Sequence, residues 1–261
     1  MAKREPDWVP AGAWLAPGYA EWAPPGALRG AVVCLWASVV PGDADRAGLI
    51  VPDACSDLVW EQGTGGYVAG PDTGPVRTVT KAGTVIAGVR FRPSAGGQAL
   101  GLPLSEIRDQ RVALGDLLPA AARKLPGSLD PAEAARRALD LAGTLVADAA
   151  ADPAVTRAAA LLRDPSARTE AVAADVGLSE RQLRRRVRAA AGYGPKTLQR
   201  VLRFQRFVRM LDAAAGPPDL ASAAAAAGYA DQAHLTRECS ALSGLTPTAL
   251  ARVRHARDGF S

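Results

Sequence analysis

Four polar side chains near the C-terminus have the types and spacing that recognition of nucleobase edges requires. They lie in GYADQAHLTRECSALSG, residues 228–244, inside a region otherwise crowded with alanine. Arginine pairs bidentately with guanine, glutamine suits adenine, and threonine contacts a base edge or a thymine methyl group. Such chemistry needs the side chains on one exposed face of a rigid element. The set consists of Gln232, His234, Thr236 and Arg237.

A helical projection separates these residues from an apolar stripe. At about 100° per residue, Leu235, Cys239 and Leu242 fall within one narrow sector. Ala233 lies nearly opposite, where a small side chain allows a close approach to a partner. We therefore expect a helix with Cys239 in its buried side and the polar set on its exposed side.

A second segment repeats this arrangement. Residues 169–192, TEAVAADVGLSERQLRRRVRAAAG, resemble residues 220–244, and each has an alanine four positions before a glycine. The alanine lets a second helix pack closely, and the glycine supplies the left-handed turn between the helices. This pattern indicates two helix-turn-helix units, a motif whose second helix normally enters a DNA major groove. In the first unit we expect a buried side of Leu183, Val187 and Ala190 and an exposed side of Arg181, Arg184, Arg185 and Arg188.

The segment between the two units has the pattern of one long helix. Pro195 suits the first turn of a helix that continues to about residue 214. About 20 helical residues at ~1.5 Å each span ~30 Å, and successive major grooves on one DNA face are ~34 Å apart. A rigid connector of this length would present both units to one side of a duplex.

The two halves of the chain differ in charge and in aromatic content. Residues 1–150 hold 14 Lys and Arg against 16 Asp and Glu, whereas residues 151–261 hold 17 against 10. The second half is therefore the part suited to a polyanionic partner. All five tryptophans lie in the first 60 residues, which suits that half to the burial of apolar surface.

Residues 8–118 have a β-rich pattern. Runs rich in Val, Ile and aromatic residues, bounded by Gly, Pro and Asp, occur at residues 28–40, 56–62, 66–70 and 83–93. The glycine-rich stretch 63–66 indicates a hairpin loop. From Val85 to Phe91 the odd-numbered residues are apolar, which is typical of a strand with one buried face. Short strands at this spacing predict a small barrel or sandwich.

The chain becomes helical after residue 126. Asp130-Pro131 and Asp152-Pro153 each combine an N-cap with a first-turn proline, and the first pair opens a helix to about residue 149. We place the domain boundary between these helices. The expected fold is therefore α+β with two domains. Residues 1–150 form a β-rich barrel-like or sandwich-like domain that ends in a helix, and residues 151–261 form an all-α domain with two helix-turn-helix units joined by a long helix.

The second half resembles the DNA-binding domain of the AraC/XylS family of bacterial transcription regulators. The resemblance covers roughly residues 153–254 and is strongest in GYADQAHLTRECSALSGLTPTAL, residues 228–250. It implies base contacts in one groove by Arg181, Arg184 and Arg185, and in the next by Gln232, His234, Thr236 and Arg237. It implies contacts to the DNA backbone by Arg188 and Lys196.

The first half is similar to a β-rich domain attached to an actinobacterial-type subgroup of this family. The similar stretches are VPDACSDLVWE, residues 51–61, and GVRFRPSAGGQALGLPLSEI, residues 88–107. The similarity implies effector sensing or dimerisation. In the first case a small apolar or aromatic molecule would bind, and in the second the aromatic side chains would form a core. Arg90 and Arg92 would pair with an anionic effector, lie on a solvated strand face or form an internal salt bridge. The candidate effector residues are Trp14, Trp36, Trp60, Tyr67, Phe91 and Arg90.

The residue inventory argues against an enzyme. A cupin-type metal site needs at least two histidines and a carboxylate, and both histidines, His234 and His255, lie in the helical half. Neither a phosphate-binding loop motif nor a nucleophile elbow motif occurs in the sequence. We therefore expect neither a catalytic residue nor a metal or cofactor.

We expect a cytoplasmic, sequence-specific DNA-binding transcription regulator that a small molecule controls. The three cysteines are odd in number and far apart, as in a reduced protein, and no apolar run approaches the ~20 residues of a membrane span. The alternative is a ligand-independent regulator whose first domain dimerises or contacts a protein. The expected partners are double-stranded DNA, the effector, a second copy of the chain if the first domain dimerises, and RNA polymerase if the protein is an activator.

Overall fold

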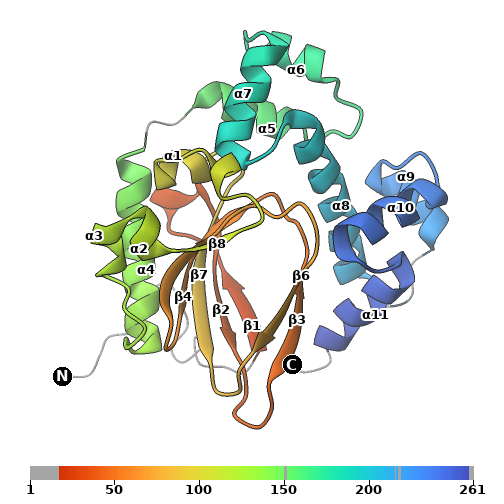
Figure 1. The fold of residues 1–261 in the computed structure, drawn as a ribbon. Helices are drawn as coiled ribbons and strands as arrows, with labels where there is room; N and C mark the ends of the chain where they lie inside the picture. The colour runs from red at the N-terminus through yellow and green to blue at the C-terminus, as the bar shows by residue number, and fades with distance from the viewer. Residues whose placement is uncertain (1–17, 150–151, 215, 217–218, 259–261) are drawn as a thin grey trace.

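The N-terminal half is built on an open antiparallel sheet. We describe residues 18–149, 152–214, 216 and 219–258 of a computed structural model (Figure 1). Six strands pair in the order β1-β2-β7-β4-β5-β8, and β3 and β6 form a separate two-stranded ribbon. The sheet is not closed into a barrel. The strands are β1 (Gly18–Trp22), β2 (Val32–Val39), β3 (Arg46–Ile50), β4 (Ser56–Glu61), β5 (Gly65–Ala69), β6 (Val76–Thr80), β7 (Val85–Phe91) and β8 (Arg111–Ala113).

The two faces of the sheet have different roles. The expected alternation in β7 is confirmed, because Val85, Ala87, Val89 and Phe91 are at most 7% exposed. These side chains belong to one hydrophobic core together with residues of α4 (Pro131–Ala147), which packs on β7 and β4. The opposite face carries Trp36 and Arg90, which are half-buried. One face therefore holds the domain together, and the other is free to carry polar chemistry.

Short helices and turns close the N-terminal half. They are η2 (Gly26–Leu28), α1 (Gly96–Leu100), η3 (Leu104–Glu106), α2 (Leu114–Leu117) and α3 (Pro119–Ala122). The predicted loop at residues 63–66 is partly wrong, because Gly65 and Gly66 begin β5. A Cβ at Gly65 would lie 3.2 Å from the Leu125 carbonyl oxygen, and one at Gly66 would lie 3.0 Å from Leu114. These glycines therefore allow close packing within a strand rather than only a turn.

The C-terminal half is helical throughout its described residues. Its helices are α5 (Pro153–Leu161), α6 (Thr169–Asp175), α7 (Glu180–Ala191), α8 (Pro195–Ala213), α9 (Leu220–Ala227), α10 (Gln232–Ser243) and α11 (Pro247–Asp258). Gly177 and Gly228 have φ values of +67° and +88°, as expected for the turns between α6 and α7 and between α9 and α10. In the ranges described above, no helix is both long and apolar enough to cross a membrane.

Candidate DNA-binding surface

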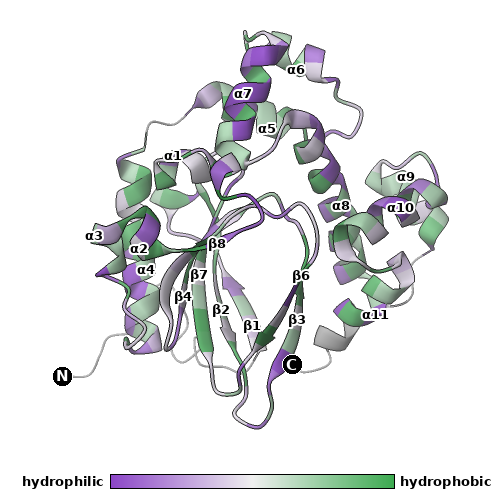
Figure 2. Cartoon of the chain, in the orientation of Figure 1, coloured by the Kyte–Doolittle hydropathy of each residue, from purple (hydrophilic) through white to green (hydrophobic). Residues whose placement is uncertain are grey.

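The first helix-turn-helix unit presents α7 as an arginine-rich helix. Ser179 and Gln182 form a reciprocal capping box that fixes where α7 begins. Leu183, Val187 and Ala190 are at most 2% exposed, so the expected buried side is confirmed. In Figure 2, α7 carries bands of hydrophilic colour along its length. The exposed side carries Arg181, Arg184, Arg185 and Arg188.

The arginines of α7 are weakly engaged with the rest of the protein. Arg184 lies 3.5 Å from Glu180, one turn earlier, in an exposed pair. Within the described part of the chain, Arg181, Arg185 and Arg188 have no carboxylate within 4.0 Å. Because little must be broken to free these guanidinium groups, the face is ready to pair with an anionic partner.

The second unit presents α10, whose exposed side is chemically mixed. Asp231 caps the helix by accepting a hydrogen bond from the His234 backbone N–H at 2.6 Å. Leu235, Cys239 and Leu242 are at most 1% exposed, as predicted. Gln232 and Arg237 are exposed, whereas His234 and Thr236 are half-buried. The sequence therefore identified both the buried and the exposed side of this helix.

Two of the α10 side chains already make hydrogen bonds within the unit. The Thr236 hydroxyl donates to the Gln232 carbonyl at 2.9 Å, which leaves its methyl group and lone pairs for a partner. His234 Nδ1 accepts from the Ala230 N–H at 3.5 Å, which leaves Nε2 for a partner. The exposed side of α10 therefore offers the Gln232 amide and the Arg237 guanidinium as donors, with the half-buried His234 ring beside them.

The connecting helix α8 fixes the second unit in place. The Arg203 guanidinium lies 4.9 Å from the centre of the Tyr229 ring, and the Tyr229 ring meets His234 edge-on at 5.2 Å. Arg200 pairs with Glu238 of α10 at 2.6 Å. Sequence patterns did not reveal this set, because its members come from α8, from α10 and from the turn between α9 and α10. The signal available was only the aromatic residue at position 229, which follows the turn glycine.

Lys196 lies in the first turn of α8 and is exposed. The buried side of α8 includes Phe204 and Phe207, which are 0% exposed. Gln205 of the same helix donates from Nε2 to the Pro52 carbonyl at 2.6 Å. The helix therefore contacts the N-terminal half as well as joining the two units.

The candidate effector residues separate into two groups. Trp60 and Phe91 are 0% exposed in the core, and Trp60 donates to the Pro126 carbonyl at 2.9 Å. Assigning these two residues to an effector site is wrong, because both are sealed on the core face of the sheet. Trp36 and Tyr67 are half-buried on the opposite face. Trp14 lies outside the described residues.

Arg90 forms an internal cluster of charges on that opposite face. Its guanidinium lies 3.2 Å from each of Glu21, Asp53 and Asp57. The Trp36 indole donates to Asp57 at 2.6 Å. Burial raises the pKa of Asp57 to about 6, although the nearby guanidinium opposes the shift. The internal salt bridge is thus the alternative that the structure favours for Arg90.

A loop joins this cluster to the helical half. Asp53, which pairs with Arg90, belongs to the connection between β3 and β4. Within the same loop, Pro52 accepts the hydrogen bond from Gln205, and Ala54, at a φ of +69°, is 1% exposed in the core of the helical half. Three successive residues therefore connect the polar face of the sheet to the helical half, with Pro52 bonded to α8.

The described residues include no candidate metal site. In the part of the chain that the structure describes, no group of three or more His, Cys, Asp and Glu side chains is arranged to hold a metal ion. The described cysteines Cys34, Cys55 and Cys239 are buried and unpaired.

Two family models match the chain. Residues 20–113 match a domain of unknown function, DUF6597, and residues 172–252 match a helix-turn-helix domain. The second match spans both units and the α8 helix between them. No curated protein matches the chain.

Two solved structures resemble part or most of the chain. A probable AraC family transcriptional regulator from Rhodopseudomonas palustris is 21% identical, with 40% of this chain and 98% of that chain covered at a TM-score of 0.35. ToxT from Vibrio cholerae, bound to (E)-4-(8-methylnaphthalen-1-yl)but-3-enoic acid, is 9% identical, with 81% and 100% covered at a TM-score of 0.45.

The arrangement of α6, α7, α8, α9 and α10 is that of two helix-turn-helix units on one connecting helix. This module is the DNA-binding part of transcription regulators, so regulation of transcription through DNA binding is the class of function. The chain therefore combines an N-terminal DUF6597 domain with a C-terminal AraC-type helix-turn-helix domain.

Proposed function

We propose that this protein binds a specific operator sequence by placing α7 and α10 in successive major grooves. The observation that carries the proposal is the pair of exposed polar faces at the two units that α8 joins. With 19 residues, α8 spans ~28 Å at ~1.5 Å per residue. This length approaches the ~34 Å between successive grooves on one face of B-DNA.

The two faces divide the work of recognition. On α7, Arg181, Arg184 and Arg185 contact base edges in one groove. On α10, Gln232 and Arg237 are the base readers, with the His234 ring and the Thr236 methyl group beside them. Contacts to DNA phosphates come from Arg188 and Lys196, which add affinity without sequence preference.

The N-terminal domain controls binding in response to a small apolar or aromatic molecule. The proposed site is the face of the sheet that carries Trp36, Tyr67 and Arg90. A Cβ on Gly88 would lie 2.4 Å from the Trp36 ring, so the indole lies against the sheet there. The 51–55 loop supports control of DNA binding from this face, because it joins the Arg90 cluster to α8.

A ligand-independent regulator is the second candidate, and one observation favours it. Arg90 is neutralised by three carboxylates of its own domain, which leaves it little capacity for an anionic effector. In this case the first domain serves dimerisation or contact with a protein.

A footprint on DNA from the gene's own promoter neighbourhood tests the main proposal. Purified full-length protein should protect about two helical turns on one face, and random duplex should compete weakly. Binding without sequence preference at any salt concentration contradicts the proposal. A tryptophan-fluorescence screen then separates the two candidates, because every tryptophan lies in the first 60 residues. An effector near Trp36 shifts the emission, whereas a purely structural domain gives no response.

A further inference from the structure

The N-terminal domain is seated against the C-terminal end of α7. Here α7 packs on α1 and η3. A Cβ on Gly97 of α1 would lie 2.6 Å from the Ala189 carbonyl oxygen. A Cβ on Gly192, just after α7, would lie 2.4 Å from Pro71. Both positions bring backbone or ring atoms into direct contact, so the two domains meet there without space for a further side chain.

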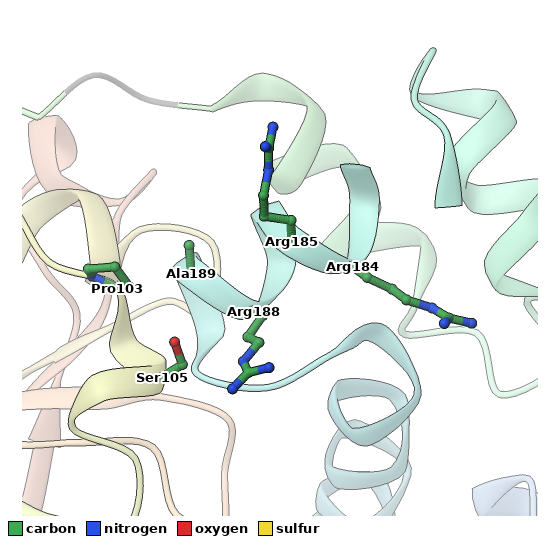
Figure 3. A pocket seen from close by; sticks show the side chains of 6 residues that line it. All are labelled: Pro103, Ser105, Arg184, Arg185, Arg188 and Ala189. Atoms are coloured by element: carbon green, nitrogen blue, oxygen red, sulfur yellow. The ribbon is translucent and has the colours of Figure 1, made fainter. Parts of the chain in front are cut away.

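This contact leaves the arginine face of α7 open. Together with Pro103, Ser105 and Ala189, three of the arginines line a cavity of about 390 Å³ (Figure 3). In Figure 3, Arg188 extends toward the side of the cavity where Ser105 lies, whereas Arg184 and Arg185 point away from Ser105. The Arg188 guanidinium and the Ser105 hydroxyl of the other domain thus lie on one side of the cavity, and Arg184 and Arg185 line the rest of it.

The chemistry of this cavity fits a phosphate group. Arg185 and Arg188 have no carboxylate within 4.0 Å among the described residues, and Arg184 has only an exposed partner at 3.5 Å. Guanidinium groups bind phosphate through charge-assisted hydrogen bonds. Serine hydroxyls are common donors to DNA phosphates. A recognition helix in a major groove is flanked by the phosphates of both strands.

We propose that Ser105 and the η3 segment complete a binding site for a DNA backbone phosphate, so that the docked N-terminal domain forms part of the DNA-binding surface of the first unit. The inference rests on the proposed DNA-binding function. Its physical basis is the position of η3, which borders the reading face without covering Arg184, Arg185 or Arg188. Glu106 is exposed on the same turn, and its carboxylate limits the strength of this contact.

The first test changes the charge at Ser105. Ser105→Asp places a carboxylate on the side of the cavity toward which Arg188 extends, where it competes for that guanidinium and repels phosphate. We expect about tenfold weaker binding and a smaller salt dependence. Ser105→Ala removes one hydroxyl donor and should weaken binding roughly threefold. Glu106→Gln removes a negative charge that repels phosphate, and it should strengthen DNA binding. Ser128→Asp makes the same charge change on an exposed residue that does not line the cavity, and it should have little effect.

The probe is a duplex that the wild-type full-length protein selects from a random library, with a scrambled duplex beside it. Affinity is measured by fluorescence anisotropy over a salt series. Because a phosphate contact reads no sequence, Ser105→Asp should weaken binding to both duplexes by the same factor. Equal behaviour of Ser105→Asp and Ser128→Asp overturns the inference. A wild-type protein that selects no duplex overturns the proposed function, and the inference with it.

A second test separates the domains. Gly97→Val introduces a side chain where α1 touches the α7 backbone, and it should weaken DNA binding if the docked domain supports the complex. Tighter binding by Gly97→Val would mean that the N-terminal domain obstructs DNA, which overturns the proposal. Circular dichroism and thermal unfolding verify that Gly97→Val is folded. If this variant does not fold, the surface variants at positions 105 and 106 alone test the proposal.

Discussion

The two helix-turn-helix units share their buried framework. They differ in their exposed side chains and in the elements against which their second helices pack. Both have a turn glycine with positive φ and a fully buried leucine, Leu183 or Leu235, as the first anchor of the second helix. On α7 the exposed side is almost uniformly arginine, and this helix packs on α1 and η3 of the other domain. The exposed side of α10 is mixed. An ion pair joins this helix to α8, and a cation–π contact joins α8 to the turn that precedes α10.

This difference indicates how affinity and specificity are distributed. A row of guanidinium groups gains much of its binding energy from phosphate and from guanine, so its contribution depends strongly on salt. A mixed set of amide, imidazole, methyl and guanidinium groups discriminates among all four base pairs. We therefore expect the first unit to supply more affinity and the second unit more sequence selectivity.

The largest effects should come from breaking one unit at a time. Leu183→Ala and Leu235→Ala each remove a side chain that is 0% exposed, and each should cost ~2–5 kcal/mol of stability. Urea unfolding measures the loss. Footprinting then tests the comparison, because Leu235→Ala should abolish protection of one half-site and keep the other. If either variant loses both half-sites together, the units are not separable readers.

The next largest effects should come from removing one exposed arginine from each recognition helix. Arg237→Ala should cost ~1–3 kcal/mol on the operator and relax selectivity at one base position. Arg185→Ala should lower affinity by a similar amount with a larger change in salt dependence, because it lies in the arginine-rich face. Binding to a set of operators with single base changes gives the readout. Equal loss on operator and random DNA for Arg237→Ala would contradict its role as a base reader.

The spacing of residues close together in the sequence was sufficient to predict the two helix-turn-helix units. It could not predict contacts between segments that are far apart in the sequence. The turn glycines, the buried leucines and the length of α8 each follow from residues within about four helical turns. The partners of Arg90 come from positions 21, 53 and 57, and no short-range spacing relates them. The contact between Gly97 and Ala189 is equally non-local, and its sequence signal was only a pair of glycines at positions 96 and 97.

The aromatic residues show the same limit within the sheet. Alternation along β7 predicted that Phe91 and Arg90 lie on opposite faces, and the burial of Phe91 is confirmed. Their joint assignment to one effector site conflicted with that alternation. Trp60 could not be separated from Trp36 without the strand register, which assigns the two indoles to opposite faces.

A smaller effect tests the support of the second unit. Arg203→Met keeps a long side chain over the Tyr229 ring and removes the charge. The variant loses the cation–π contact and the 4.0 Å ion pair with Glu238. Together these losses should cost ~1 kcal/mol, seen as a lower thermal midpoint and weaker protection of the α10 half-site. Arg209→Met, at an exposed position of the same helix, is the matched control. Equal weakening at both half-sites would mean that Arg203 stabilises α8 as a whole rather than the second unit.

The smallest expected effect concerns Lys196, which lies where α7 gives way to α8. The Lys196 ammonium would contact a phosphate rather than a base. Lys196→Ala should therefore weaken binding to operator and random duplex by the same factor, equivalent to ~1 kcal/mol or less. It should also lower the slope of log affinity against log salt by about one. Lys124→Ala, at an exposed position of the other domain, controls for net charge. A loss confined to the operator would make Lys196 a base reader, and affinity and selectivity would then not be divided between the units as their faces predict.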